Sequence, residues 1–313
     1  MKKSLLIFGV SGFAGSYLAA EFFNNGYQVY GCDVQKGERI PDHTAFEKCD
    51  ILDSNAVKRI INKVKPSHIV NLAAVSSVGA SWSIPQKTVD VNVVGALNIL
   101  EAVRDIDRAI KVMFIGSSEE YAVSEFPISE NSPLDANNPY GISKVMQENF
   151  AQLYRERYGM KVYCVRPFNH TGVGQNDNFV LPSWCRQAAE IEKSGNPGVI
   201  RVGNLEAERD FSDVRDIVRA YRMIIENDNC GRIYNVGSGR AYKLSELLEY
   251  IVSLCSQKIT VETDPDRFRP VDNKVICCDN SLIKNELEWR AESDIFNVMK
   301  EMFEKYISSE VGI

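Results

Sequence analysis

A short apolar run that leads directly into three evenly spaced glycines constrains the fold of this chain more than any other feature. Residues 4–8 (Ser-Leu-Leu-Ile-Phe) have the pattern of a fully buried strand, and the glycines follow at Gly9, Gly12 and Gly15. Apolar residues then recur with helical period from Phe13 to Phe23. The glycines therefore lie on a turn between a buried strand and a helix, where the first helix amide groups favour a bound anion.

The spacing of these glycines, GxxGxxG, is typical of a turn that holds a dinucleotide. The first glycine permits the tight turn, the second lets the backbone approach a pyrophosphate, and the third lets helix and strand pack closely. A second strand, residues 27–31, leads to Asp33, where such folds place a carboxylate that binds the adenosine ribose. Because a carboxylate would repel a 2′-phosphate, Asp33 favours NADH over NADPH. The predicted cofactor contacts in this segment are Gly9, Ser11, Gly12, Phe13, Ala14, Gly15 and Asp33.

Strand-like and helical runs alternate through the first half of the chain, which predicts an α/β fold with a Rossmann-like, doubly wound parallel sheet. Strands are expected at 45–48, 68–73, 112–116 and 162–165, and helices near 54–65, 92–104 and 143–158. The pattern then loosens, which predicts a smaller, irregular C-terminal substrate lobe; a helix at 213–226 and a strand at 232–236 return to the large lobe. The expected division is a dinucleotide-binding domain of 1–167 plus about 210–238, and a substrate lobe of 168–209 plus 239–313.

Composition fits an enzyme that works in the cytoplasm. A chain of 313 residues with 44% hydrophobic content can bury a large core, and no segment has the apolar length of a membrane span. The eight cysteines show no CxxC spacing and no cluster with the three histidines, so reduced thiols are expected and no metal. A net charge of −6 argues against general nucleic-acid binding.

Tyr140 and Lys144 provide the candidate proton-transfer pair. They are four residues apart in the run Asn-Pro-Tyr-Gly-Ile-Ser-Lys and share one helix face. A nearby cation favours phenolate, so the pKa of Tyr140 is expected to fall from about 10 toward the working pH. The segment 115–121 (Ile-Gly-Ser-Ser-Glu-Glu-Tyr) follows a predicted strand, where ligands approach an open α/β sheet.

Taken together, these motifs resemble the extended short-chain dehydrogenase/reductase superfamily over nearly the whole chain. The resemblance is carried by the glycine turn, the strand end at residues 71–74 (Asn-Leu-Ala-Ala), Asn92, Ser118 and Tyr140-x-x-x-Lys144. Within the superfamily, segments 168–172, 201–211 and 269–272 resemble the nucleotide-sugar branch that acts on GDP-linked deoxyhexoses. The pattern is most similar to reductases of GDP-4-dehydro-6-deoxy-D-mannose, with GDP-mannose 4,6-dehydratases as near relatives.

This resemblance implies a role for each matching residue. Tyr140 would protonate the C4 oxygen as hydride arrives, Lys144 would anchor the nicotinamide ribose, and Ser118 would hydrogen-bond the substrate carbonyl. Further implied cofactor contacts are Asp50, Ile51, Leu72, Ala73, Ala74, Asn92 and His170. Implied nucleotide-sugar contacts are Ser118, Glu119, Asn169, Val180, Arg201, Asn204, Arg209, Arg269 and Asp272, with Val202 beside them at the guanine.

The implied activity is NAD(P)H-dependent reduction of the C4 ketone to give GDP-D-rhamnose. Glu119 keeps a second enzyme open, because dehydratases of this branch use a glutamate next to the catalytic Ser/Thr to remove the C5 proton; a 4-epimerase is a related alternative. A non-catalytic dinucleotide sensor on the same scaffold is the third hypothesis. The family further suggests a homodimer through the helices near 92–104 and 143–158.

Overall fold

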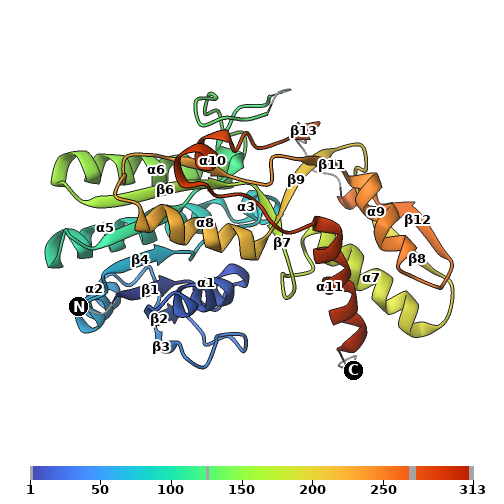
Figure 1. The fold of residues 1–313 in the computed structure, drawn as a ribbon, viewed down its shortest axis with the longest axis horizontal. Coiled ribbons are helices and arrows are strands. Elements are labelled where there is room, and N and C mark those ends of the chain that lie inside the picture. Colours follow the sequence, from blue (N-terminus) through green and yellow to red (C-terminus); the bar gives the residue numbers. More distant parts are fainter. Residues whose placement is uncertain (1–2, 125–126, 268–272, 310–313) are drawn as a thin grey trace.

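The computed structural model describes residues 3–124, 127–267 and 273–309. A large parallel sheet with helices on both faces forms one half of the molecule, and a smaller, mixed lobe lies beyond the carboxyl ends of its strands (Figure 1). The predicted fold class, a Rossmann-like doubly wound sheet, is confirmed. The lobes are joined by several chain crossings, since the chain leaves the large sheet after residue 167 and returns at residue 234.

The large sheet has seven strands, all parallel, in the order β10-β6-β5-β4-β1-β2-β3. The strands in the middle of the sheet are short and mainly buried, as strands covered on both faces are, whereas the edge strand at residues 45–48 (Ala-Phe-Glu-Lys) is only partly buried. The bounds are β1 (Ser4–Phe8), β2 (Gln28–Asp33), β3 (Ala45–Lys48), β4 (His68–Asn71), β5 (Lys111–Ile115), β6 (Lys161–Pro167) and β10 (Tyr234–Val236).

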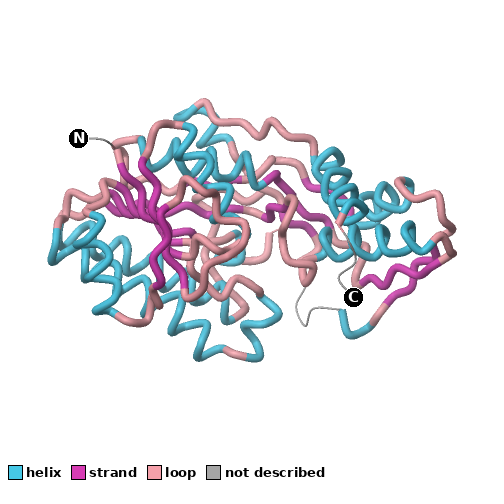
Figure 2. The backbone as a smooth tube through the Cα atoms, turned by 90° about the horizontal axis from the view of Figure 1, so that it is seen from below, coloured by secondary structure: helices cyan, strands magenta, loops and turns pink. Residues whose placement is uncertain are grey.

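Two layers of helices cover the two faces of this sheet (Figure 2). Helices α1 (Phe13–Asn24) and α8 (Val214–Glu226) pack on the face that receives Leu5 and Ile7 of β1. Helices α2 (Ser54–Val64), α5 (Gly95–Ile106) and α6 (Pro139–Tyr158) pack on the face that receives Leu6 and Phe8. Alternate residues of one strand thus belong to two different cores, as the pleat requires.

The small lobe has a core of its own, built on helices α7 (Val180–Ser194), α9 (Leu244–Ser253) and α11 (Ile295–Ser308). A parallel pair, β8 (Gly198–Val202) and β12 (Ile259–Thr263), lies beside α7. A second sheet joins the lobes, with strands β7 (Asn169–Thr171), β9 (Glu208–Asp213), β11 (Ala241–Lys243) and β13 (Val275–Ile276).

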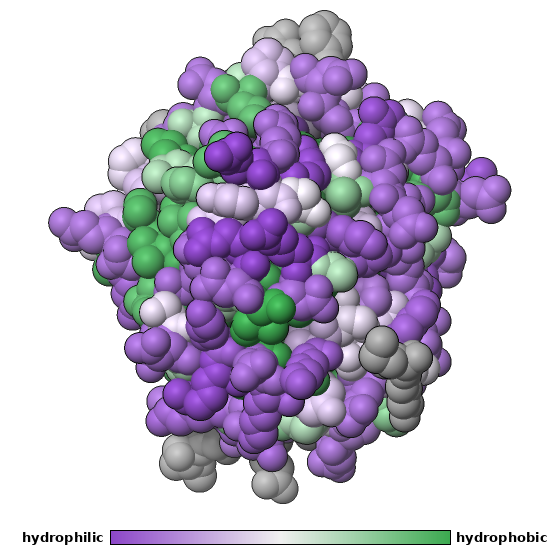
Figure 3. Space-filling view, turned by 90° about the vertical axis from the view of Figure 1, so that its left-hand side faces the viewer, coloured by the Kyte–Doolittle hydropathy of each residue, from purple (hydrophilic) through white to green (hydrophobic). Residues whose placement is uncertain are grey.

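Short elements complete the described chain: α3 (Val78–Ser83), α4 (Pro85–Val89), the π-helical turn η1 (Asp90–Val94), the 3-10 turns η2 (Ser118–Glu120) and η3 (Pro265–Arg267), and α10 (Ser281–Leu287). The helix expected at 92–104 is therefore a π-helical turn followed by α5. Within the described residues, no helix has the length and apolar character to cross a membrane. The end of the molecule away from the small lobe is mainly hydrophilic (Figure 3).

Candidate active site

The glycine turn has the geometry that its sequence predicts. Gly9 adopts φ +82°, and a Cβ atom there would lie 2.5 Å from the backbone nitrogen of Ala73. Gly12 is the N-cap residue of α1, and a Cβ atom on Gly15 would lie 2.4 Å from the carbonyl oxygen of Val10. Only glycine fits at the first and third positions, so the backbone at the start of α1 is held open to an anion.

Asp33, at the end of β2, is fixed beside this turn. One carboxylate oxygen accepts a hydrogen bond from the Ser11 backbone N–H (3.1 Å), and the other accepts one from the N–H of Val34 (2.8 Å). The Ser11 hydroxyl donates to the carbonyl of Gln35 (2.6 Å). A carboxylate set next to a helix N-terminus fits the ribose and pyrophosphate of an adenine dinucleotide, so these residues suit the implied cofactor.

The next group of predicted cofactor contacts lies on neighbouring loops. Asp50 caps a turn, because its side chain accepts the N–H of Leu52 (2.9 Å), and Ile51 is buried against Gly95 at the start of α5. Leu72, Ala73 and Ala74 are partly buried and follow β4, directly against Gly9. The structure therefore brings the carboxyl ends of β1, β2 and β4 together at one edge.

Asn92, a predicted cofactor contact, is hydrogen-bonded within the protein. It lies in the π-helical turn and is completely buried, and its side-chain oxygen accepts the N–H of Val75 (2.8 Å). Its amide nitrogen donates to the Val75 carbonyl (3.2 Å) and to the Ser143 hydroxyl (2.8 Å). Because these bonds occupy the oxygen and the nitrogen of the amide, Asn92 ties the loop after β4 to α6.

Tyr140 and Lys144 occupy the first two turns of α6. The helix begins there because Asn138 caps it, accepting the Gly141 N–H (2.9 Å), and Pro139 takes the first helical position. A Cβ atom on Gly141 would lie 2.3 Å from the carbonyl oxygen of Glu119, so the start of α6 packs directly on η2. The Lys144 ammonium lies 5.7 Å from the centre of the Tyr140 ring and donates to the Ile115 carbonyl (2.7 Å).

Burial dominates the electrostatics of this pair. It raises the pKa of Tyr140 above its ordinary value, and a hydrogen bond with Ser117 offsets only part of that rise. Burial also lowers the pKa of Lys144 to about 8. The expectation that Lys144 would pull the pKa of Tyr140 down is therefore wrong, because the cost of burying a phenolate exceeds the attraction of the ammonium. At neutral pH Tyr140 holds its proton.

Ser117, and not the predicted Ser118, is the serine whose hydroxyl acts on the Tyr140 phenol. Ser117 is the N-cap of η2 and adopts an extended backbone, while Ser118 is already the first residue of that turn. Ser118 is buried. The two serines follow the same strand, and only the onset of the 3-10 turn decides which one faces α6.

Glu119 lies beside this pair, as predicted. Its carboxylate accepts a hydrogen bond from the side chain of Asn138 (3.0 Å), the residue that caps α6. The sequence reasoning missed its neighbour Glu120, whose side chain is completely buried behind Ser117 and close to Arg166 of β6. An acidic residue in a Ser-Ser-Glu-Glu run gives no sequence signal of burial, which is a property of the packed fold.

Asn169 and His170 start the small lobe at β7, opposite the glycine turn. The His170 ring stacks on Phe13 of α1 at 6.3 Å between ring centres, and its Nδ1 contacts the Phe168 carbonyl (3.1 Å). Burial lowers the pKa of His170, so the imidazole is neutral at pH 7. Asn169 pairs with Phe211 of β9. Both residues thus lie where the two lobes meet.

The predicted substrate contacts in the small lobe fall in two groups. Arg209 is buried on β9 and donates to the Glu208 carbonyl (2.7 Å), Asn204 caps a turn by accepting the Glu206 N–H (3.0 Å), and Val180 begins α7. Val202 is fully buried in the small-lobe core. Arg269 and Asp272 lie outside the described residues.

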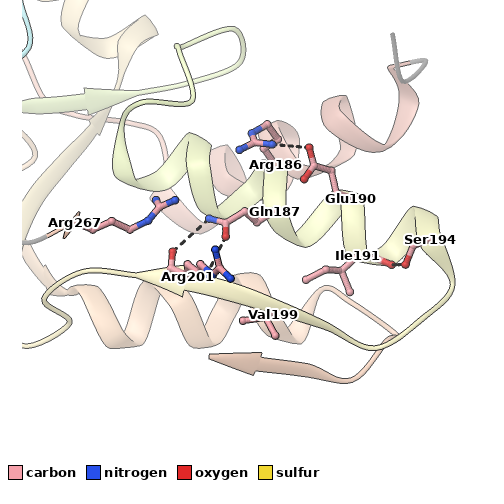
Figure 4. Close-up of a pocket in the computed structure, with 8 residues that line it drawn as sticks. All are labelled: Arg186, Gln187, Glu190, Ile191, Ser194, Val199, Arg201 and Arg267. Carbon is pink, nitrogen blue, oxygen red and sulfur yellow. Dashed lines mark hydrogen bonds and ion pairs between the residues drawn. The ribbon is translucent and has the colours of Figure 1, made fainter. Parts of the chain in front are cut away.

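Arg201 lines a pocket of about 490 Å³ between α7 and β8 (Figure 4). Its backbone N–H donates to the side-chain oxygen of Gln187 (2.9 Å), and Arg201 is exposed. Arg267 enters from the other end and donates to the Ser183 hydroxyl (3.4 Å). The sequence reasoning did not include Arg267, Gln187 or Arg186, because only the meeting of α7, β8 and η3 brings them together.

Comparison with known proteins matches almost the whole chain. Residues 6–302 match the family described as GDP-mannose 4,6 dehydratase. The chain is 28% identical to a GDP-6-deoxy-D-mannose reductase from Pseudomonas aeruginosa, over 94% of each chain. It is 31% identical to GDP-mannose 4,6 dehydratase 1 from Arabidopsis thaliana, over 97% of this chain and 90% of that one. The solved structure of RMD from Pseudomonas aeruginosa complexed with NADPH is similar at a TM-score of 0.84 and 26% identity, covering 98% of both chains.

Proposed function

The chain belongs to the GDP-mannose 4,6 dehydratase family, and from this premise we propose that it reduces the C4 ketone of GDP-4-dehydro-6-deoxy-D-mannose to give GDP-D-rhamnose. It is an NAD(P)-dependent oxidoreductase of the short-chain dehydrogenase/reductase superfamily. The direction of the reaction, reduction at C4, and the identity of the sugar are what we propose.

The reductase proposal rests on Tyr140, a proton donor on the same face of α6 as Lys144, whose ammonium lies 5.7 Å from the centre of the Tyr140 ring. Reduction of a ketone needs a proton donor beside the carbonyl, and burial keeps the Tyr140 phenol protonated at neutral pH. A reaction that begins by oxidising a sugar hydroxyl would instead need the phenolate.

In the proposed reaction, a bound NADH or NADPH supplies hydride to C4. Tyr140 gives its proton to the C4 oxygen, so that the ketone becomes an alcohol, and the Ser117 hydroxyl orients that oxygen. Lys144 holds its position through the Ile115 carbonyl and provides a positive charge behind the phenol as the proton leaves. The glycine turn and Asp33 fix the other end of the cofactor.

We propose that the nucleotide end of the substrate reaches the small lobe, where Arg201, Asn204 and Arg209 were predicted to bind it. The pocket between α7 and β8 supports this for Arg201, which lines it and has a guanidinium group that suits phosphate oxygens; Asn204 and Arg209 are not among its lining residues. Replacing Arg201 with Ala should raise KM for the GDP-sugar and leave kcat nearly unchanged, because a contact that binds substrate and transition state equally well affects only KM.

A 4,6-dehydratase is the second candidate, and the position of Glu119 favours it. Its carboxylate lies at the cap of α6, next to Tyr140, where a base for the C5 proton would be needed. Purified protein should be incubated with NADH or NADPH and GDP-4-keto-6-deoxymannose, and separately with GDP-mannose, with products identified by mass and NMR. A reductase consumes one NADH for each product, whereas a dehydratase shows no net change in the nicotinamide absorbance.

The variant Glu119→Gln separates the two enzymes further. It removes the base and keeps the size of the side chain, so a reductase should retain most of its activity and a dehydratase should lose nearly all of it. Glu156→Gln, at the exposed end of α6, is the matched control. Turnover of GDP-mannose without net use of NADH, abolished by Glu119→Gln alone, would establish the dehydratase instead.

We propose that two copies of the chain pair through α6. Ile142, Met146 and Leu153 are exposed on this helix, at 47%, 37% and 53% of their surface, and their spacing places them along one stripe. Val94, just before α5, is also exposed. Leu153→Glu should convert a dimer to a monomer in light scattering coupled to gel filtration; a monomeric wild-type protein would remove the proposal.

A further inference from the structure

Glu120 is a buried carboxyl group directly behind the proposed proton donor, and the mechanism above does not use it. One oxygen accepts the backbone N–H of Ser117 (2.6 Å), which closes a capping box around η2. Among the described residues, the other oxygen has no hydrogen-bond partner, although the side chain is 0% exposed. A buried carboxylate with one unbonded oxygen is costly, so its charge state depends on its neighbours.

The nearest cation is already committed to another acid. Arg166 forms a two-pronged contact with Glu148 of α6 through its Nε and Nη2 atoms, and its Nη1 donates to the Tyr121 hydroxyl (2.8 Å). Glu120 is left 3.7 Å from the Nε atom, too far for a hydrogen bond. One guanidinium group therefore faces two buried carboxyl groups and satisfies only Glu148.

The second cation within reach is Lys144 itself. The groups that face Glu120 come from α6 (Tyr140, Lys144 and Glu148), from β6 (Cys164 and Arg166) and from its own segment (Glu119 and Tyr121). Burial and the charge of Glu148 raise the pKa of Glu120 to about 8. Burial lowers the pKa of Lys144 to the same region, and an ionised Glu120 opposes that fall.

We propose that Glu120 is a positioning residue for the proton-transfer pair: its carboxyl group holds the Ser117 turn in place, and the charge on its unbonded oxygen acts on Tyr140 and Lys144 of α6. The inference rests on the proposed function only in that Tyr140 is taken as the proton donor. When Glu120 loses its proton as pH rises, its negative charge favours the protonated forms of Tyr140 and Lys144. The donor then stays protonated further into the alkaline range.

Two substitutions should affect the pH profile of kcat/KM differently. Glu120→Gln keeps an oxygen for the Ser117 N–H and removes the charge, so the alkaline limb should shift to lower pH by about one unit. Glu148→Gln frees Arg166 and removes a repelling charge, so Glu120 should ionise at lower pH; because Glu120 is already ionised across the alkaline limb of the wild type, that limb should stay in place. A purely structural glutamate would lower thermal stability in both variants without separating the two profiles.

A measurement without substrate keeps this inference independent of the proposed function. In protein labelled with ¹³C at the glutamate carboxyl and the tyrosine Cζ carbons, the Glu120 signal, assigned by its loss in Glu120→Gln, should titrate near pH 8. The Tyr140 signal, assigned with Tyr140→Phe, should titrate at lower pH in Glu120→Gln than in the wild type.

Failure of the proposed function and failure of the role proposed for Glu120 would give different results. If neither GDP-sugar is turned over, the proposed function fails and the NMR titration alone decides the role of Glu120. A Glu120 signal that titrates near the ordinary value for glutamate, or a Tyr140 titration unaffected by Glu120→Gln, overturns the inference. If Glu148→Gln does not fold, the Glu120→Gln profile decides, and a profile that superimposes on the wild type also overturns it.

Discussion

The free energy of unfolding should fall as pH rises toward 8, and Glu120→Gln should remove most of that fall. In the unfolded chain Glu120 has an ordinary pKa of 4.5 and is ionised at pH 6.5, whereas in the folded protein it keeps its proton up to about pH 8. The folded state therefore binds one more proton across this window. Its contribution to stability is complete below the unfolded pKa and is lost as pH rises through the folded pKa.

The magnitude follows from the two buried groups. Between pH 6.5 and 8.0, a folded pKa of about 8 for Glu120 reduces the free energy of unfolding by roughly 2 kcal/mol. Lys144 acts in the opposite direction, because its pKa is lowered from 10.5 to about 8 and the unfolded chain binds more protons there. Lys144 offsets a minor part of that loss over the same window, which leaves a net loss on the order of 1 kcal/mol.

Urea denaturation at pH 6.5 and 8.0, followed by circular dichroism, would measure this difference in wild type and in Glu120→Gln. His68 and His170 should not distinguish the two proteins, since burial lowers the pKa of His68 to about 4 and also lowers that of His170. The wild type should lose roughly 2 kcal/mol more than the variant over this pH change, because only the wild type has the Glu120 contribution. Equal losses in the two proteins would refute the argument that Glu120 is protonated in the fold.

Three further predictions concern the rest of the site. Tyr140→Phe should reduce turnover by about 10² or more and leave NADH affinity, measured by fluorescence, unchanged; near-normal turnover would remove Tyr140 from the mechanism. Wild-type protein should show a higher kcat/KM with NADH than with NADPH, and Asp33→Asn should narrow that ratio by about tenfold because the repelling charge is gone; a wild-type preference for NADPH would contradict the role of Asp33. Gly15→Ala should lower the melting temperature strongly, since its Cβ would lie 2.4 Å from a backbone oxygen, whereas Gly79→Ala, whose Cβ would meet no atom closer than 3.9 Å, should be tolerated.

Local sequence patterns were sufficient to predict the features of the site that depend on the shape of the backbone. The glycine spacing predicted the turn at Gly9 and Gly15, because the absence of a side chain is itself the structural requirement. The spacing of Tyr140 and Lys144 predicted a shared helix face, because helical period fixes it. Alternating strand-like and helical runs predicted the parallel sheet, because the period of the apolar residues differs between strands and helices.

Properties that depend on packing were not accessible from those patterns. The rise in the pKa of Tyr140 comes from its burial between elements distant in sequence, and the choice of Ser117 over Ser118 depends on where a 3-10 turn begins. Asn92 matched a motif by position, yet its amide is used inside the protein. The Glu120 and Arg166 contact joins residues from two neighbouring segments of the sheet edge, and neither residue is unusual by itself.

The connection between β6 and β10 has a consequence for synthesis of the protein on the ribosome. Strand β6 ends at Pro167, and the strand that covers its outer edge, β10, is complete only at Val236. At about 5–20 residues per second, roughly 3–14 s pass between the two events. During that interval β6 is an uncovered edge strand. Six of its seven residues are buried in the folded protein, and exposed edges of this kind pair readily with other chains. The nascent chain is therefore most exposed to aggregation while its small lobe is being made, and chaperone demand should be greatest at that stage.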